Sequence, residues 1–316
     1  MECFGWIGGK IGASYRIFPA RQSCRRPPQT LTMPLAPIDV PPIVLCFAAC
    51  DATGGAGLQA DVLTLASMGC HPLSVAAAVA VRDTRGVEEL LAIESDTVAA
   101  QARALLEDIP VQAFKLGMMG SVENVAVVAE ILSDYPDLPL VLEPALAYVE
   151  GDEAGAEDML AALGELILPQ VTVLVASRHE VMRLASIDFG DGDDDDDDEE
   201  LSADDAVARL LALGVGYVLL TGASEPGPQV VNVLVGADGV VRTDAWERLP
   251  ERYLGAGATL AAAVAAALAH GMEVPEAVRE AQEFTWQALS AAYRPGMGMA
   301  LPDRFFWARG GDAGDA

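Results

Sequence analysis

Short runs of apolar residues alternate along the chain with longer segments in which apolar residues return every three or four positions. The runs are typical of buried strands, and the periodic segments predict helices with one apolar face. We expect strands at 42–49, 72–81, 86–93, 111–118, 139–144, 171–176 and 215–222, and helices at 58–69, 95–109, 122–135, 156–167, 178–186, 203–214 and 274–292. Ser95 is the expected N-cap of the second helix. The alternation predicts an α/β fold in one domain, a mostly parallel sheet with helices on both faces.

Two later runs, 229–236 and 239–249, flank an Ala-Asp-Gly turn at 237–239 and predict a β-hairpin. Such a hairpin adds antiparallel strands to the otherwise parallel sheet. Ligands of open α/β sheets bind beyond the carboxyl ends of the strands. We therefore expect the ligand-binding and catalytic residues in the turns that follow strands.

Two glycine-rich turns stand out. The first, "DATGGAG" at Asp51–Gly57, directly follows the first predicted strand. The second, at Gly255–Ala258, follows the hairpin and leads into the Ala-rich helix "TLAAAVAAALA". Backbone N–H groups at the start of a helix can hold a phosphate or a negative transition state. The four residues Gly255–Ala258 carry no acid, base or nucleophile, so the second turn predicts anion binding through the backbone alone.

Three segments depart from the α/β pattern. Residues 1–40 are basic and Pro-rich near their end, and they lack the continuous apolar core of a signal peptide. We expect an unstructured leader there, with Met33 as a candidate start of translation; an organelle-targeting sequence is the alternative. Residues 188–201 form an acidic run that predicts a solvated loop, because its spacing does not match a calcium loop. Residues 311–316 predict a flexible tail.

The composition narrows the choice of partners. The formal charge of −28 over 316 residues argues against nucleic acid and against an acidic membrane surface. No apolar run is long enough to span a bilayer. The five cysteines lie in the first quarter without a paired pattern, which favours reduced thiols in the cytoplasm. The three histidines are too scattered to predict a metal cluster.

Three stretches carry a resemblance to a known family. They are "DATGGAGLQADVLTLASMG" at Asp51–Gly69, "DTRGV" at Asp83–Val87 followed by "VQAFKLGMMGS" at Val111–Ser121, and the turn at Gly255 with its helix. In order and spacing they resemble the hydroxymethylpyrimidine/phosphomethylpyrimidine kinases of thiamine biosynthesis, within the ribokinase-like superfamily. "GMG" at Gly296–Gly298 is similar to a segment near the end of that family. The resemblance identifies residues 41–310 as a ribokinase-like kinase domain.

The resemblance implies transfer of the ATP γ-phosphoryl group to the hydroxymethyl group of an aminopyrimidine, or to its phosphate, with Mg²⁺ screening the phosphates. The glycines of the first turn would let the backbone approach the substrate, and the second turn would be the anion hole. A homodimer is also implied. The implied site residues are Gly255, Gly257 and Ala258 for catalysis; Ala49, Gly57, Asp61, Arg82 and Met118 for the substrate; Ser177, Thr221 and Thr259 for the nucleotide; and Glu143 for the metal.

Several positions depart from the family pattern, mostly where its reactive side chains lie. Ala258 stands where the family has a cysteine, and Arg82 where it has the glutamine that reads the pyrimidine. The family's aspartate becomes Glu143, while two lysines become Val149 and Thr221. Ser177 replaces an asparagine, Ala49 a glycine and Ala52 a proline.

A positioned base contributes ~10²–10⁴-fold, so the loss of this group alone would leave a slow kinase. Two alternatives stay open. One is a catalytically impaired homologue that binds a pyrimidine or nucleotide as a regulator or partner. The other is a kinase for another small alcohol, in which Arg82 reads an anionic group.

Overall fold

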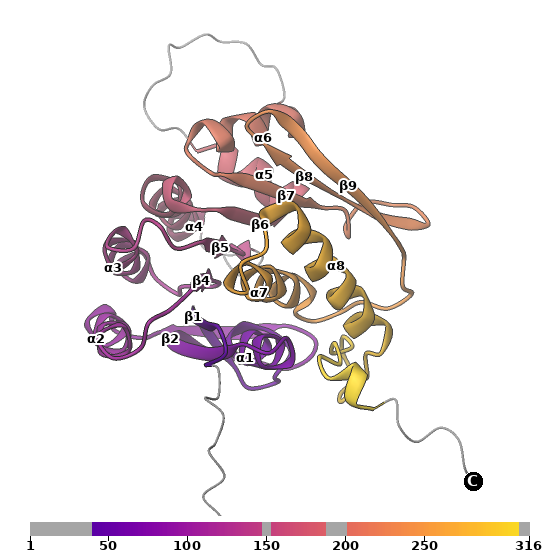
Figure 1. The fold of residues 1–316 in the computed structure, drawn as a ribbon, viewed down its shortest axis with the longest axis horizontal. Coiled ribbons are helices and arrows are strands. Elements are labelled where there is room, and N and C mark those ends of the chain that lie inside the picture. Colours follow the sequence, from indigo (N-terminus) through magenta and orange to yellow (C-terminus); the bar gives the residue numbers. More distant parts are fainter. Residues whose placement is uncertain (1–39, 147–152, 188–200, 310–316) are drawn as a thin grey trace, which may run out of the picture. The chain divides into compact units, whose positions relative to one another are not determined.

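A computed structural model describes residues 40–146, 153–187 and 201–309 (Figure 1). The predicted leader, acidic loop and tail lie almost entirely outside the described residues, as does Val149. The described part contains no helix that is long and apolar enough to cross a membrane.

One sheet organises the described part of the chain, with the strand order β3-β2-β1-β4-β5-β6-β7-β8-β9. The strands β2, β1, β4, β5, β6 and β7 are parallel, whereas β3, β8 and β9 pair antiparallel. Their bounds are β1 Ile43–Asp51, β2 His71–Arg82, β3 Val87–Ala92, β4 Ala113–Leu116, β5 Leu140–Leu142, β6 Val173–Ser177, β7 Tyr217–Thr221, β8 Gln229–Gly236 and β9 Gly239–Glu247. The central strands read as continuous apolar runs because both faces of the sheet are covered.

Helices cover the two faces in separate groups (Figure 1). Helices α1, α7 and α8 pack on one face, and α2 to α6 on the other, each group with its own core. The bounds are α1 Gly57–Ser67, α2 Ser95–Leu106, α3 Val122–Ser133, α4 Glu153–Ala162, α5 Arg178–Ala185, α6 Ala203–Ala212, α7 Ala256–Ala269 and α8 Val274–Ser290. Helix α7 is buried nearly all round, between the sheet, α1 and α8, which explains its alanine-rich sequence.

The predicted fold class is confirmed, and so is the hairpin, whose strands β8 and β9 are joined by Ala237 and Asp238. Two local predictions were wrong. Helix α2 begins at Ser95, with Glu94 in the cap position and no side-chain cap. The helix predicted to end near Ile167 ends as an α-helix at Ala162, and the chain continues as a π-helical turn through Leu163–Ile167.

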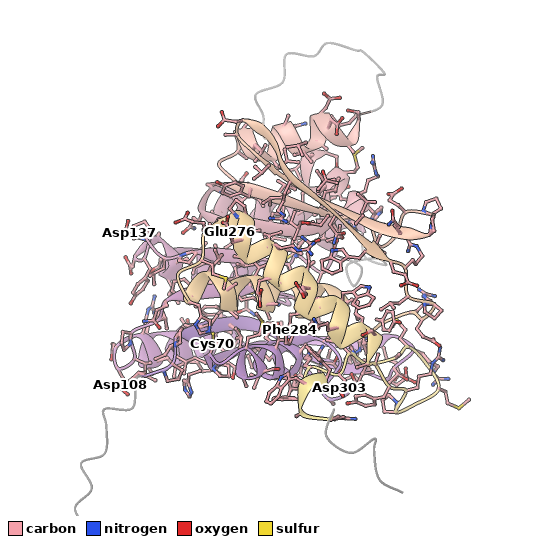
Figure 2. All side chains as sticks on the ribbon, turned by 45° about the vertical axis from the view of Figure 1, so that its right-hand side comes forward. Cys70, Asp108, Asp137, Glu276, Phe284 and Asp303 are labelled. Carbon is pink, nitrogen blue, oxygen red and sulfur yellow. The ribbon has the colours of Figure 1, made fainter. Side chains whose placement is uncertain are left out.

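Acidic side chains lie around the outside of the molecule. Asp108, Asp137 and Glu276 are exposed at three separate places (Figure 2). A surface of this kind keeps charges in water, where screening weakens their repulsion. The few charges inside the protein are therefore the ones that need explanation.

Candidate active site

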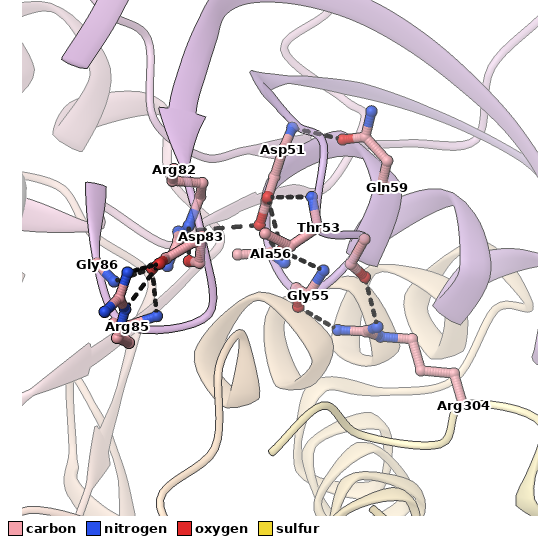
Figure 3. A network of polar contacts seen from close by, with 11 residues as sticks. Asp51, Thr53, Gly55, Ala56, Gln59, Arg82, Asp83, Arg85, Gly86 and Arg304 are labelled. Atoms are coloured by element: carbon pink, nitrogen blue, oxygen red, sulfur yellow. Dashed lines mark hydrogen bonds and ion pairs between the residues drawn. The ribbon is translucent and has the colours of Figure 1, made fainter. Parts of the chain in front are cut away.

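The first glycine-rich turn is folded by one carboxylate. Asp51, the last residue of β1, accepts hydrogen bonds from Thr53 N at 2.8 Å, from Thr53 Oγ1 at 2.7 Å and from Ala56 N at 2.8 Å (Figure 3). Gly57 has a φ of 56°, and a Cβ there would lie 2.2 Å from the carbonyl oxygen of Ala49. Only glycine fits at position 57, because α1 starts directly against the strand.

The second turn presses against the first. Gly255 has a φ of 78°, and a Cβ there would lie 1.8 Å from the carbonyl oxygen of Gly55. The two turns therefore touch backbone to backbone. The N–H groups of Ala256, Gly257 and Ala258 find no hydrogen-bond acceptor within the described ranges. Such N–H groups at the positive end of a helix dipole form an anion site.

A cavity of about 220 Å³ lies between these two turns and the carboxyl ends of β1, β2 and β4. It brings together eight residues that the sequence predicted, which are Ala49, Gly57, Arg82, Met118, Glu143, Gly255, Gly257 and Ala258. Asp51, Lys115, Glu180 and Tyr253 also line it. The cavity combines backbone N–H groups at a helix start with buried charged side chains, and a few placed polar groups in a concave pocket are typical of small-molecule sites.

A second cavity, of about 410 Å³, lies between the hairpin, α7 and α8. Trp246 and Trp286 line it with their rings stacked, 6.3 Å between centroids and 29° between planes. Asn232 and Gln282 add amide groups. An aromatic wall with a few polar groups suits a planar ring such as a nucleobase. The two cavities share Tyr253 and Ala256, so they meet at the second turn.

Buried charges form the floor of the smaller cavity. Lys115 Nζ lies 3.0 Å from Asp61 Oδ1 and 3.7 Å from Glu143 Oε2, and both Lys115 and Asp61 are fully buried. Burial lowers the pKa of Lys115, but the neighbouring carboxylates outweigh it and raise that pKa. Burial raises the pKa of Asp61, with Lys115 opposing.

Glu143 differs from the other two members of this group because its side chain is partly exposed at the cavity wall. Burial raises its pKa to about 7; Lys115 opposes this change, and Glu180 and Asp61 add to it. A carboxyl with a strongly raised pKa at a cavity wall is a candidate functional group. Its Oε1 also lies close to the second turn, 3.1 Å from where a Cβ of Gly257 would be.

Comparison with known proteins agrees with this geometry. The sequence profile of the phosphomethylpyrimidine kinase family matches residues 51–303. A hydroxymethylpyrimidine/phosphomethylpyrimidine kinase from Streptomyces coelicolor is 36% identical over 284 residues, which cover 89% of this chain and 100% of that protein. The protein of the same name from Escherichia coli is 31% identical, over 78% of this chain and 91% of its own.

The chain belongs to the phosphomethylpyrimidine kinase family. Solved structures agree with this assignment. A pyridoxal kinase from Bacillus subtilis in complex with ADP superposes with a TM-score of 0.73 at 26% identity, covering 85% of this chain and 99% of the other. A phosphomethylpyrimidine kinase from Clostridium difficile gives a TM-score of 0.62 at 27% identity, covering 78% and 99%. The predicted ribokinase-like class and the predicted resemblance are both confirmed.

Four residues that the family resemblance predicted lie away from the cavity walls. Asp61 is buried beneath the smaller cavity, against Lys115. Ser177 caps α5 through Glu180, and Thr221 Oγ1 donates to the carbonyl of Ala176 at 3.3 Å. Thr259 is fully buried, and none of the four lines either cavity. Their polar groups contact the protein itself.

Arg82 lines the smaller cavity, but it has a carboxylate beside it. Its Nη1 lies 3.8 Å from Asp51 Oδ2, and its side chain is only 2% exposed. The sequence pattern alone did not pair these two residues, which end the neighbouring strands β2 and β1. The charge of Arg82 is therefore partly balanced before any ligand arrives.

Sequence reasoning did not single out several residues of the two cavities and of the contact between the turns, which are Asp51, Lys115, Glu180, Asn232, Trp246, Tyr253, Gln282, Trp286 and Arg304. One signal was available for Lys115, because it is one of only two lysines in the chain and lies within an apolar strand. Such a charge is almost never fully buried unless it is paired. Arg304 gave no local signal, since its partners lie more than forty residues away.

Proposed function

We propose that the protein transfers the γ-phosphoryl group of ATP to the hydroxymethyl group of an aminopyrimidine, or to its phosphate ester. The observation that carries this proposal is the meeting of the two cavities at Tyr253 and Ala256, beside the N–H groups of the second turn. A nucleotide in the larger cavity and an acceptor in the smaller one would face each other across these groups. Names of relatives and the ADP complex of the Bacillus subtilis pyridoxal kinase support it.

The backbone supplies the main electrostatic element of this mechanism. The N–H groups of Ala256, Gly257 and Ala258 would donate hydrogen bonds to charge that develops on the transferred group. Gly57 and the first turn would hold the acceptor, with Met118 against its ring. Phosphoryl transfer depends mostly on positioning and electrostatic stabilisation, so a site of this kind can act without a strong base.

The acidic residues fit Mg²⁺, which when bound screens the phosphate charge. Mg²⁺ in such sites takes one or two carboxylates together with phosphate oxygens. Glu143 and Glu180 both line the smaller cavity, and repulsion between them contributes to the raised pKa of Glu143. A divalent cation would relieve this repulsion. We therefore propose Glu143 as a metal ligand, with Glu180 beside it.

Ala258 sets the expected rate. It lines the cavity at the first turn of α7 but offers no group that could take a proton from the acceptor hydroxyl. We expect slow turnover by the natural protein. Ala258→Cys would place a thiol at a helix N-terminus, where the dipole lowers the thiol pKa, and should raise turnover by ~10²-fold.

The test is single-turnover transfer of labelled phosphate from Mg·ATP to hydroxymethylpyrimidine and to its phosphate. Ala258→Ser, which has nearly the size of cysteine but no ionisable group, is the matched control. Fast wild-type turnover that Ala258→Cys does not improve would show that another residue accepts the proton. ATP binding without transfer by any variant would favour the regulator alternative, and transfer only to another alcohol such as pyridoxal would reassign the acceptor. No ATP binding at all would contradict the proposal.

We further propose that the protein works as a homodimer in the cytoplasm. Cys46, Cys50 and Cys70 are free thiols, which suits a reducing compartment. Sedimentation equilibrium gives the oligomeric state directly, and a monomeric mass would contradict the dimer.

A further inference from the structure

Arg304 is a buried cation that touches both glycine turns. It follows α8 in the chain and is 3% exposed, yet it lines neither cavity. Its Nη2 donates to the carbonyl of Gly55 at 2.6 Å (Figure 3). Its Nη1 donates to the carbonyl of Gly54 at 3.1 Å, and its Nε donates to Thr259 Oγ1 at 3.1 Å. One guanidinium therefore joins the first turn to α7.

Thr259 extends this link to the second turn. Its hydroxyl accepts from Arg304 and donates to the carbonyl of Gly255 at 2.8 Å. Gly55 completes the loop of contacts, because its carbonyl accepts from Arg304 and also packs against the Cα of Gly255. The fixed fork of a guanidinium can hold three acceptors at set angles, which a lysine cannot do.

The backbone of Arg304 is itself held in place. Ser67 Oγ, at the end of α1, donates to the carbonyl of Arg304. The neighbouring Asp303 N donates to the carbonyl of Ala288 in α8 at 2.9 Å. The backbone of Arg304 is thus held by α1 and α8, while its side chain reaches both turns.

The charge of Arg304 persists at neutral pH. Burial lowers its pKa to about 10, and Asp61, Tyr293 and Asp51 oppose that change. A positive charge behind the start of α7 strengthens the anion site in the same direction as the helix dipole.

We propose that Arg304 is a positioning residue that fixes the two glycine turns against each other and so sets the distance between acceptor and phosphoryl group. This inference rests on the proposed function. A displacement of about 1 Å between reacting groups costs on the order of 10²-fold in rate. The expected consequence of losing the guanidinium is therefore a fall in kcat that exceeds any change in KM.

The first test does not depend on activity. Amide hydrogen exchange is followed in peptides that cover 51–57 and 254–260, for the full chain and for Arg304→Met. We expect exchange to become at least about tenfold faster in both peptides, because the charged hydrogen bonds that join the turns are lost. Arg309→Ala is the matched control, since Arg309 pairs with Asp303 in the same segment but does not touch either turn. Unchanged exchange in both peptides would overturn the proposal.

The second test measures phosphoryl transfer in whichever background is more active, wild type or Ala258→Cys. Rates are expressed per active site, with the concentration of active sites determined by titration. Arg304→Met should lower kcat by ~10²-fold with KM changed less, and Arg304→Lys should recover only part of it. Added guanidinium ion should restore activity to Arg304→Ala but not alter Arg309→Ala. Thr259→Val, which keeps the charge and breaks the link to Gly255, should lower kcat in the same direction and serves if the arginine variants do not fold.

These outcomes separate the two proposals. Inactive wild type with loosened turns in Arg304→Met would contradict the kinase function, while confirming that Arg304 fixes the two turns against each other. Normal kcat per titrated site in Arg304→Met or in Thr259→Val would show a purely structural role and overturn the positioning role.

Discussion

The carboxylates of Asp244 and Glu143 are both largely removed from water, yet their pKa values shift in opposite directions. The pKa of Asp244 is lowered to about 2, and the pKa of Glu143 is raised to about 7. We call Asp244 with Arg242, Arg279 and Gln282 the outer cluster, beside the hairpin. Asp61, Lys115 and Glu143 are the inner cluster, below the smaller cavity. The difference between the clusters is in how completely the carboxylate oxygens are paired.

In the outer cluster, both oxygens of Asp244 are paired twice. Arg242 donates to them at 2.7 and 2.9 Å, Arg279 at 3.2 Å and Gln282 at 2.9 Å. The hydrogen bonds from Arg242 are the main cause of the lowered pKa of Asp244, against the opposing effect of burial. A fully satisfied network of this kind stabilises the fold.

In the inner cluster, a single ammonium group serves two carboxylates. Asp61 Oδ1 lies near Lys115 but makes no hydrogen bond within the described residues. Glu143 keeps its pKa near 7 because one distant lysine does not offset its burial. Incomplete pairing costs stability and leaves capacity for a ligand, which is what an active site requires.

The largest effect should come from breaking the inner cluster. Lys115→Met leaves two carboxylates without their cation and should lower the free energy of unfolding by about 3–5 kcal/mol at pH 7.5. Urea denaturation measures this loss. The control is the double variant Asp61→Asn with Lys115→Met, which should recover part of the stability. A single-variant loss below about 1 kcal/mol would show that the cluster is neutralised in another way.

Asp244→Asn should break the outer cluster with a pH signature. The folded pKa of Asp244, about 2, lies below the usual 3.8, so its contribution is present above pH 4 and is lost as the pH falls toward 2. At pH 7 the variant should lose about 2 kcal/mol, and the difference from wild type should shrink through this window. Asp137→Asn, at an exposed position, is the control. An equal loss at pH 7 and pH 2.5 would contradict the pairing argument.

Glu143→Gln should have the opposite effect to Asp244→Asn, because removing the poorly paired carboxylate of Glu143 is expected to stabilise the protein. The folded pKa lies above the usual 4.5, so the carboxylate becomes progressively unfavourable between pH 4.5 and 7. The variant should gain about 1–2 kcal/mol at pH 8 and little at pH 4.5, while its phosphoryl transfer falls. Thermal denaturation at both pH values measures the gain. A loss of stability at pH 8 would mean that Glu143 is needed to pair Lys115.

The smallest effect is expected at an exposed ion pair. Arg103 Nη2 lies 3.4 Å from Glu130 Oε1, and both side chains are more than half exposed. Glu130→Gln should change the free energy of unfolding by no more than about 0.5 kcal/mol. A change as large as that of Asp244→Asn would show that burial and pairing do not separate the two classes of charge.

Much of the site could be predicted because its key elements are local. Gly57 begins α1 and Gly255 precedes α7. Glycine-rich sequence between a predicted strand or hairpin and a helix was enough to predict the two turns as places where a ligand could bind. The structure places both turns at one cavity, with Arg82, Met118 and Glu143 beside them. Ser177, Thr221 and Thr259, which the resemblance assigned to the nucleotide, make hydrogen bonds within the protein, and the tryptophan-lined cavity is formed by other residues.

The sequence by itself determined the order of strands and helices, the class of fold and the family, because apolar periodicity and turn glycines act over a few residues. Only the tertiary structure decided how the charges are paired. Lys115 meets Asp61 across 54 positions, and Arg304 meets Gly55 across 249. Residues so far apart in the sequence become neighbours only when the sheet forms, and burial away from water then requires their polar groups to pair. Neither effect leaves a pattern in the local sequence. The stability and the chemistry of the site depend on those pairings.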